Sequence, residues 1–144
     1  MAKFKSTFQS ARAIDETFAY LADFSNARFW DPSVSTATRL DSSPLAVGSK
    51  FTLKAKFWGR VLALNYEIDV LEPVHRLVFV ADLPLGRSVD EIVVVRSDMS
   101  LGCTVTYDAR VYLSGRSRLL EPLVALEFQR TARRACTGLQ RELA

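Results

Sequence analysis

The sequence predicts an α+β protein in which a long C-terminal helix covers one face of an antiparallel sheet. Residues 117–143 have an uninterrupted helical pattern, whereas most of the chain before them alternates between apolar and polar residues as strands do. The strands follow one another without crossover helices, which indicates antiparallel pairing. The chain of 144 residues shows no repeat or linker, so we expect a single domain over residues 1–144.

The first part of the chain predicts one strand and two short helices. Residues 3–9 alternate and predict a half-buried strand. Residues 10–22 predict a helix with apolar residues on one side, and residues 27–30 predict a shorter one. Asp31 and Pro32 end the second helix, because the residue before a proline disfavours helical geometry.

The middle of the chain predicts six further strands, over residues 34–40, 51–57, 62–70, 76–81, 88–96 and 103–113. Trp58 and Gly59 mark a tight turn that joins two of them into a hairpin. Residues 82–87 contain a proline and a glycine and predict a loop, and residues 98–102 predict the turn of the last hairpin. Alternation alone does not tell which face of the strand at 88–96 is inward.

The C-terminal helix is expected to have a first turn at residues 118–120 and then a main helix of about 21 residues, with Pro122 near its start. It is the only element long enough to cover the sheet. Its apolar stripe is bulky at both ends and small in the middle, where Thr131, Ala132, Ala135 and Gly138 lie. Empty space in a core costs about 2–5 kcal/mol for a leucine-sized void. Large side chains from the sheet, or a bound ligand, must therefore fill the space opposite.

Composition and charge exclude several classes of protein. No apolar run approaches the roughly 20 residues of a membrane span, and the first residues lack the apolar core of a signal peptide. Cys103 and Cys136 both lie in apolar patterns, which predicts reduced core cysteines in a cytoplasmic protein. The basic excess, net charge +3, falls on the outer face of the C-terminal helix. No aromatic residue interrupts these arginines, so we expect no nucleic-acid partner.

Metal and cofactor sites are also not expected. The only histidine, His75, falls in a predicted surface turn, and the two cysteines are far apart in the sequence. A dedicated metal site needs several such ligands at close spacing. The sequence therefore predicts neither a metal, nor a cofactor, nor a nucleophile–histidine pair, and it leaves a homodimer open.

The order of one strand, two helices, six strands and one long helix resembles a known superfamily over essentially the whole chain. Its members are the START-domain, Bet v 1-like (SRPBCC) and polyketide cyclase/dehydrase proteins, which share the helix-grip fold. The segments that carry the resemblance are AIDETFAYLADFSNARFWDPSV, VGSKFTL, YEIDVLEPVHRLVF, VTYDARVYL and RLLEPLVALEFQR. The segment at Trp30–Pro32 and the turn at Glu72–Leu77 look most like the polyketide cyclase branch. The resemblance implies a hydrophobic ligand held between a curved sheet and the last helix.

The candidate site residues follow from the apolar faces of these elements. The predicted ligand-binding residues are Trp30, Phe51, Leu53, Phe57, Leu64, Tyr66, Phe79, Tyr107, Phe128, Ala132 and Ala135. Tyr66 and Tyr107 place phenols on apolar faces and are candidates for anchoring a ligand or for catalysis. If Asp90 points inward, it must be paired or have its pKa raised, and it is then the best candidate base.

Three functions remain open at this point. The first is binding or transport of a lipid-like or aromatic small molecule. The second is an enzyme of the polyketide cyclase or dehydratase kind, which needs a proton donor and acceptor near the substrate. The third is a protein-interaction module that uses the arginine face of the last helix and has a filled core.

Overall fold

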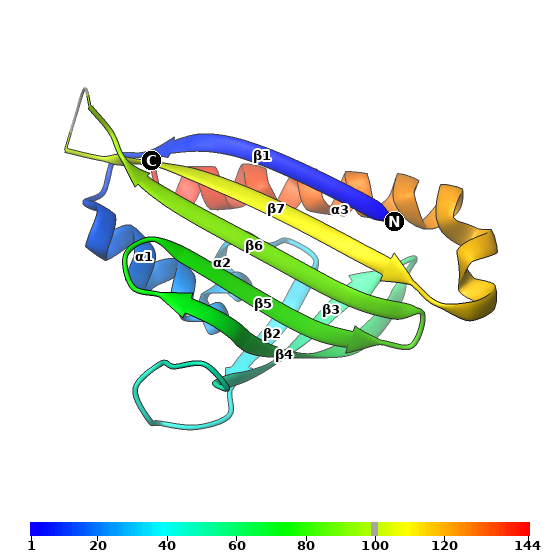
Figure 1. Ribbon diagram of the computed structural model, residues 1–144. Helices are drawn as coiled ribbons and strands as arrows, with labels where there is room; N and C mark the ends of the chain where they lie inside the picture. The colour runs from blue at the N-terminus through cyan, green and yellow to red at the C-terminus, as the bar shows by residue number, and fades with distance from the viewer. Residues whose placement is uncertain (99–100) are drawn as a thin grey trace.

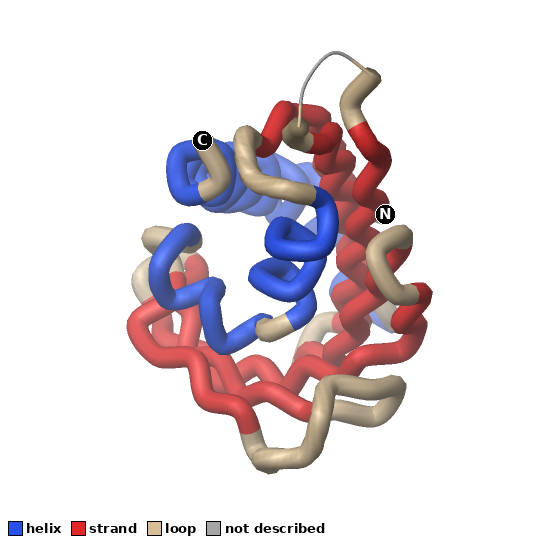
Figure 2. The backbone as a smooth tube through the Cα atoms, turned by 90° about the vertical axis from the view of Figure 1, so that its left-hand side faces the viewer, coloured by secondary structure: helices blue, strands red, loops and turns tan. Residues whose placement is uncertain are grey.

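The computed structural model describes residues 1–98 and 101–144 and has the predicted α+β helix-grip architecture (Figure 1). The elements are β1 Ala2–Ser10, α1 Ile14–Ala22, the 3₁₀ helix η1 Phe24–Asn26, α2 Ala27–Trp30, β2 Val34–Arg39, β3 Lys50–Phe57, β4 Arg60–Glu72, β5 Arg76–Leu83, β6 Gly86–Arg96, β7 Cys103–Leu113, η2 Gly115–Leu120 and α3 Glu121–Glu142. The strands form one antiparallel sheet in the order β1-β7-β6-β5-β4-β3-β2. Viewed from the side, this sheet curls around the helices (Figure 2).

The prediction of a loop over residues 82–87 was wrong. Strands β5 and β6 continue to Leu83 and Gly86, which pair with each other and leave a two-residue turn. A Cβ atom on Gly86 would lie 1.8 Å from the carbonyl oxygen of Tyr112. The glycine thus permits close approach of β6 to β7 instead of ending the strand. Of the predicted turn at 98–102, residues 99–100 lie outside the described residues.

The N-terminal helix is shorter than predicted, because Ser10 completes β1 by pairing with Cys103 and the helix begins only at Ile14. The C-terminal helix agrees closely with the prediction: η2 forms the first turn and α3 follows with 22 residues. No helix in the described part of the chain is long and apolar enough to cross a membrane.

The long helix covers less of the sheet than the sequence suggested. Helix α3 packs mainly on β1 and α2, and only lightly on β7. The β3–β5 part of the sheet is covered by η1, whose Phe24 ring stacks on Phe79 at 4.1 Å and meets the Tyr66 ring edge-on at 4.9 Å. Because two different segments cover the two halves of the curled sheet, space remains between α3 and the middle strands.

Helices α2 and α3 touch at a glycine. A Cβ atom on Gly138 would lie 1.9 Å from the backbone oxygen of Trp30. Gly138 therefore serves close packing of the two helices, and our expectation that it faces the space beneath α3 was wrong. This contact places Trp30 beside the C-terminal half of α3. Trp30 is buried, with 6% of its surface exposed.

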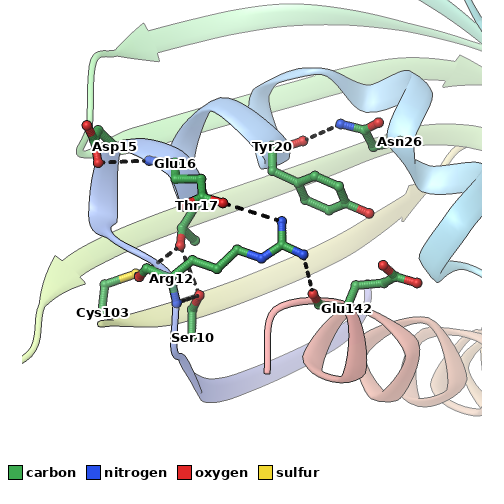
Figure 3. A network of polar contacts seen from close by, with 9 residues as sticks. All are labelled: Ser10, Arg12, Asp15, Glu16, Thr17, Tyr20, Asn26, Cys103 and Glu142. Atoms are coloured by element: carbon green, nitrogen blue, oxygen red, sulfur yellow. Dashed lines mark hydrogen bonds and ion pairs between the residues drawn. The ribbon is translucent and has the colours of Figure 1, made fainter. Parts of the chain in front are cut away.

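The C-terminal end of α3 is tied to the connection between β1 and α1 (Figure 3). The Arg12 guanidinium donates to the backbone oxygen of Glu142 at 2.9 Å, and the Ala11 amide donates to that of Leu143 at 3.0 Å. The guanidinium also lies over the Tyr20 ring, 5.4 Å from its centre. These contacts use carbonyl groups that a helix terminus leaves without intrahelical partners. They hold the C-terminal end of α3 against the connection between β1 and α1.

Candidate functional site

A cavity of about 650 Å³ lies between α3, the two short helical segments and the curled sheet. All the residues predicted to bind a ligand line it except Phe51 and Phe79. Those in the lining are Trp30, Leu53, Phe57, Leu64, Tyr66, Tyr107, Phe128, Ala132 and Ala135. The volume lies within the range of about 300–1,000 Å³ that is typical of small-molecule sites.

The cavity exists because α3 carries small residues where it passes the middle of the sheet. Thr131, Ala132 and Ala135 form part of the wall, with the larger Val124 and Phe128 toward the start of the helix. The side chains of the sheet do not fill the space opposite these residues. The sequence left two alternatives open for this space. The first, that large side chains of the sheet fill it, is therefore wrong.

Phe51 and Phe79 are fully buried and lie outside the cavity lining. Their rings meet each other at 6.1 Å between centres, and both pack against Phe24. The prediction placed them on the inward face, which is correct, but η1 lies between them and the cavity. Phe24 lines the cavity in their place. The sequence predicts only a turn over residues 23–26, and that pattern carries no signal that Phe24 points inward.

The three candidate polar residues come together at one end of the cavity. Asp90 is inward and has 7% of its surface exposed, which resolves the face of β6. Its Oδ2 accepts a hydrogen bond of 2.7 Å from the Tyr107 hydroxyl, and its Oδ1 accepts a longer one of 3.5 Å from Ser88. The Ser88 hydroxyl lies 3.4 Å from that of Tyr66. Four polar side chains from β4, β6 and β7 thus form one buried cluster, which we call the inner cluster.

Burial sets the protonation of this cluster. Desolvation raises the pKa of Asp90 to about 6, against the opposing hydrogen bond from Tyr107 and with a smaller increase from the charge of Asp31. Desolvation also raises the pKa of Tyr66 and of Tyr107 well above the usual value of 10. Near neutral pH both phenols are therefore hydrogen-bond donors that keep their protons, and Asp90 is the group of the inner cluster that titrates.

Three lining residues in or near the inner cluster were not among the predicted site residues. Ser88 lies two positions before Asp90 on the same strand face, a spacing that could have pointed to it. Asp31 accepts hydrogen bonds from the Ser33 amide and hydroxyl at 2.9 and 2.7 Å, and its pKa is raised mainly by burial. The sequence indicated only a helix end there. Burial raises the pKa of the Cys136 thiol to about 12, so this cysteine is not an activated nucleophile.

The other end of the cavity opens between turns and the start of α3. Trp58 in the β3–β4 turn is 48% exposed, and Leu120 at the end of η2 is 43% exposed. Leu85 lines the same end from the β5–β6 turn. Of the described lining residues, only Lys56 and Arg60 carry a positive charge, and both belong to the β3–β4 hairpin, next to its turn. We call this end the mouth.

Residues outside the cavity complete the account of the predicted candidates. His75 is exposed in the β4–β5 turn, as predicted. Cys103 is buried in β7, and its thiol lies 3.9 Å from the Arg12 carbonyl oxygen. Arginines 28, 133, 134 and 141 border a separate, shallower depression between α2 and α3. In the described part of the chain, no three His, Cys, Asp or Glu side chains are grouped in a way that could hold a metal ion.

Solved structures with this fold span nearly the whole chain at low sequence identity. A START superfamily protein from Mycobacterium smegmatis has a TM-score of 0.80 at 11% identity, covering 99% of this chain and 97% of its own. A protein from Thermus thermophilus, TTHA0849, has a TM-score of 0.78 at 13% identity, with coverage of 98% and 96%. The Zhui aromatase/cyclase from Streptomyces sp. R1128 has a TM-score of 0.75 at 14% identity, with coverage of 98% and 92%. At these identities the likeness establishes the fold alone.

Sequence comparison identifies the family. No curated protein sequence gives a significant match. The family described as polyketide cyclase / dehydrase and lipid transport, in contrast, matches residues 1–144, which is the entire chain. Because this match covers the entire chain, the protein belongs to the polyketide cyclase/dehydrase and lipid-transport family, and its helix-grip fold and the cavity beneath α3 agree with that membership.

Proposed function

We propose that the protein binds a hydrophobic small molecule in the cavity between α3 and the sheet. The observation that carries this proposal is the contrast between the walls and the inner end of the cavity. The walls are aliphatic and aromatic and include leucines from β3 and β4 together with Val124 and Phe128 of α3. The polar groups are few and concentrated in the inner cluster. Apolar walls with a small number of placed polar groups are typical of sites for small hydrophobic ligands.

The family match supports this proposal, since lipid transport is part of the family's description. It does not choose a ligand. A cavity of about 650 Å³ is large enough for an extended acyl chain or a fused aromatic system, and an apolar occupant gains from leaving water in proportion to its buried area. The third function open from the sequence, an interaction module, required a filled core. The cavity is therefore evidence against this third function.

A polyketide cyclase or dehydratase remains a second candidate, because the hydrogen bond between Tyr107 and Asp90 supports it. A buried carboxyl with a pKa of about 6 is suited to act as a general base near neutral pH. The cavity offers no matching acid among its described tyrosines and Cys136, since burial raises the pKa of each of them. Because these protonated groups are weak acids, we rank binding above turnover. A catalysed cyclisation that Asp90→Asn abolishes while binding persists would reverse this ranking.

The binding proposal is tested by a substitution on α3 that fills the cavity with a larger side chain. Ala135 is 8% exposed and lines the cavity, so Ala135→Trp places an indole in the ligand's space. Gln140→Trp adds the same ring on the exposed face of the same helix and serves as control. The readout is the fluorescence of N-phenyl-1-naphthylamine, a neutral apolar probe, with circular dichroism to establish folding. We expect the wild type and the control to bind the probe and Ala135→Trp to lose binding at least about tenfold. Equal binding by folded Ala135→Trp rejects the proposed site.

A further inference from the structure

The polar groups of the cavity are distributed unevenly between its two ends. Carboxyl and hydroxyl groups line the inner end, with Asp90 in the inner cluster and Asp31 close enough for its charge to act on Asp90. The cationic lining residues, Lys56 and Arg60, belong to the mouth. A ligand with one polar head and a long apolar body therefore meets different chemistry at the two ends.

The hydroxyl protons of the inner cluster are directed along contacts that end at Asp90. Tyr107 has one hydroxyl proton, and it is donated to Asp90 Oδ2. Ser88 donates its proton to Asp90 Oδ1, so the contact between Ser88 and Tyr66 requires the tyrosine to donate to the serine. The Tyr107 proton is thus committed to Asp90, and those of Ser88 and Tyr66 are directed to cluster oxygens at the longer distances of 3.5 and 3.4 Å. What the cluster offers a ligand is the lone pairs of the carboxylate and of the hydroxyl oxygens.

We infer that the inner cluster is a headgroup subsite for an amphiphile whose polar head donates hydrogen bonds, a hydroxyl or an ammonium, and that it discriminates against anionic heads. This inference rests on the proposed function and adds the class of ligand to it. An O–H or N⁺–H group supplies a further donor to Asp90, whose hydroxyl donors are Tyr107 at 2.7 Å and the more distant Ser88 at 3.5 Å. A carboxylate or sulfate head meets only acceptors and a buried like charge, which no described cation of the inner end offsets.

The charge on Asp90 supplies the discrimination, and Tyr107 orients the carboxylate by its 2.7 Å hydrogen bond. The other titratable groups that face this end are Tyr66, Tyr107, Cys136 and Asp31. The first three stay protonated near neutral pH because burial raises their pKa values. Burial raises the pKa of Asp31 as it does that of Asp90. Both carboxyls lose their protons as the pH rises, and the ionised carboxylates then repel an anionic head.

The test compares probes that share a ten-carbon chain and differ in the head: decan-1-ol, decylammonium and decanoate. Each displaces N-phenyl-1-naphthylamine at about pH 8, some two units above the Asp90 pKa of about 6. We expect decan-1-ol and decylammonium to bind wild-type protein at least about tenfold more tightly than decanoate. In Asp90→Asn we expect this difference to fall to about threefold or less, since the buried charge is gone. The exposed Asp69 on β4 supplies the matched control, because Asp69→Asn removes the same charge outside the cavity.

A second measurement uses wild-type protein alone, so it tests the inference even if Asp90→Asn does not fold. Decyl sulfate stays anionic throughout, so its affinity for wild-type protein follows the protein's charges alone. We expect its dissociation constant to fall severalfold from about pH 8 to about pH 5, as Asp90 becomes protonated. Equal binding of all heads with no pH effect on decyl sulfate overturns the inference and leaves the binding proposal intact. Failure of every probe, including N-phenyl-1-naphthylamine itself, overturns the binding proposal.

Discussion

The Tyr107 hydroxyl donates to Asp90 Oδ2 at 2.7 Å, from one strand of the sheet to its neighbour. This bond is a strong neutral contact for a carboxyl group in an apolar cavity that forms no ion pair with any described residue. A buried carboxylate without a cation destabilises a folded protein, and hydrophobic replacements of such groups are often neutral or stabilising. The pair is thus better suited to recognition than to stability, and its two members predict different responses to substitution.

The stability of the protein is expected to fall as the pH rises from about 4 to about 6. The pKa of Asp90 is about 6 in the folded protein against a usual 3.8, so the folded state holds this proton more tightly than the unfolded state does. The stabilising contribution is complete below the unfolded pKa and is lost as the pH rises through the folded pKa. The loss approaches about 3 kcal/mol, since one pKa unit corresponds to about 1.4 kcal/mol. Urea unfolding between about pH 4 and pH 8 measures this slope.

Asp90→Asn is expected to reduce that slope and to make the unliganded protein more stable at about pH 8, by about 1–3 kcal/mol. The amide is uncharged, and its oxygen still accepts from the Tyr107 hydroxyl. A smaller slope of the same sign remains, because the pKa of Asp31 is also raised by burial. Asp69→Asn provides the comparison for loss of one exposed charge. An Asp90→Asn protein that is less stable than wild type at about pH 8 would show that the carboxylate is stabilising.

Tyr107→Phe is expected to act in the opposite way. It removes the hydrogen bond that holds the pKa of Asp90 down, so that pKa rises above about 6. The carboxylate then lacks its strongest partner, which costs about 1–3 kcal/mol at about pH 8 and less at about pH 5, where Asp90 is protonated. Carbon-13 NMR of the aspartate carboxyls measures the pKa, and urea unfolding measures the stability. The control is Tyr112→Phe on the same strand, since Tyr112 is exposed and does not line the cavity.

The fold could be predicted from the sequence because it depends on periodicity, which each strand and helix carries in its own residues. The site was only partly predictable. The small residues of α3 and the inward face of β7 were found because their neighbours in sequence define a face. Phe24 and Asp31 were missed because they lie in turns, where no period relates one residue to the next. Gly138 was misassigned because its small size serves a backbone contact at Trp30 that only the packed structure reveals.

Ligand release is expected to depend on Trp58 at the mouth. This residue has a left-handed φ of 52°, and with Gly59 at 74° it forms the β3–β4 turn. Left-handed geometry disfavours a tryptophan and suits asparagine. Trp58→Asn is therefore expected to keep or raise stability by up to about 1 kcal/mol while ligand dissociation accelerates about threefold or more. Stopped-flow displacement of N-phenyl-1-naphthylamine gives the rate. Phe29→Asn, which removes a 57% exposed ring outside the cavity lining, should leave it unchanged.

Gly138→Ala is expected to destabilise the protein, although the same exchange inside an ordinary helix stabilises it by about 1 kcal/mol. The added methyl group would lie 1.9 Å from the Trp30 backbone oxygen, so α2 and α3 must separate. Overpacking of this kind costs about 1–3 kcal/mol. Because Trp30 also contacts the Tyr107 ring at 6.0 Å between centres, the shift reaches the inner cluster, and probe affinity should fall with stability. Urea unfolding and probe titration of Gly138→Ala test both effects, with the exposed Thr137→Ala as control. A gain in stability would mean that the two helices are not in close contact at this glycine.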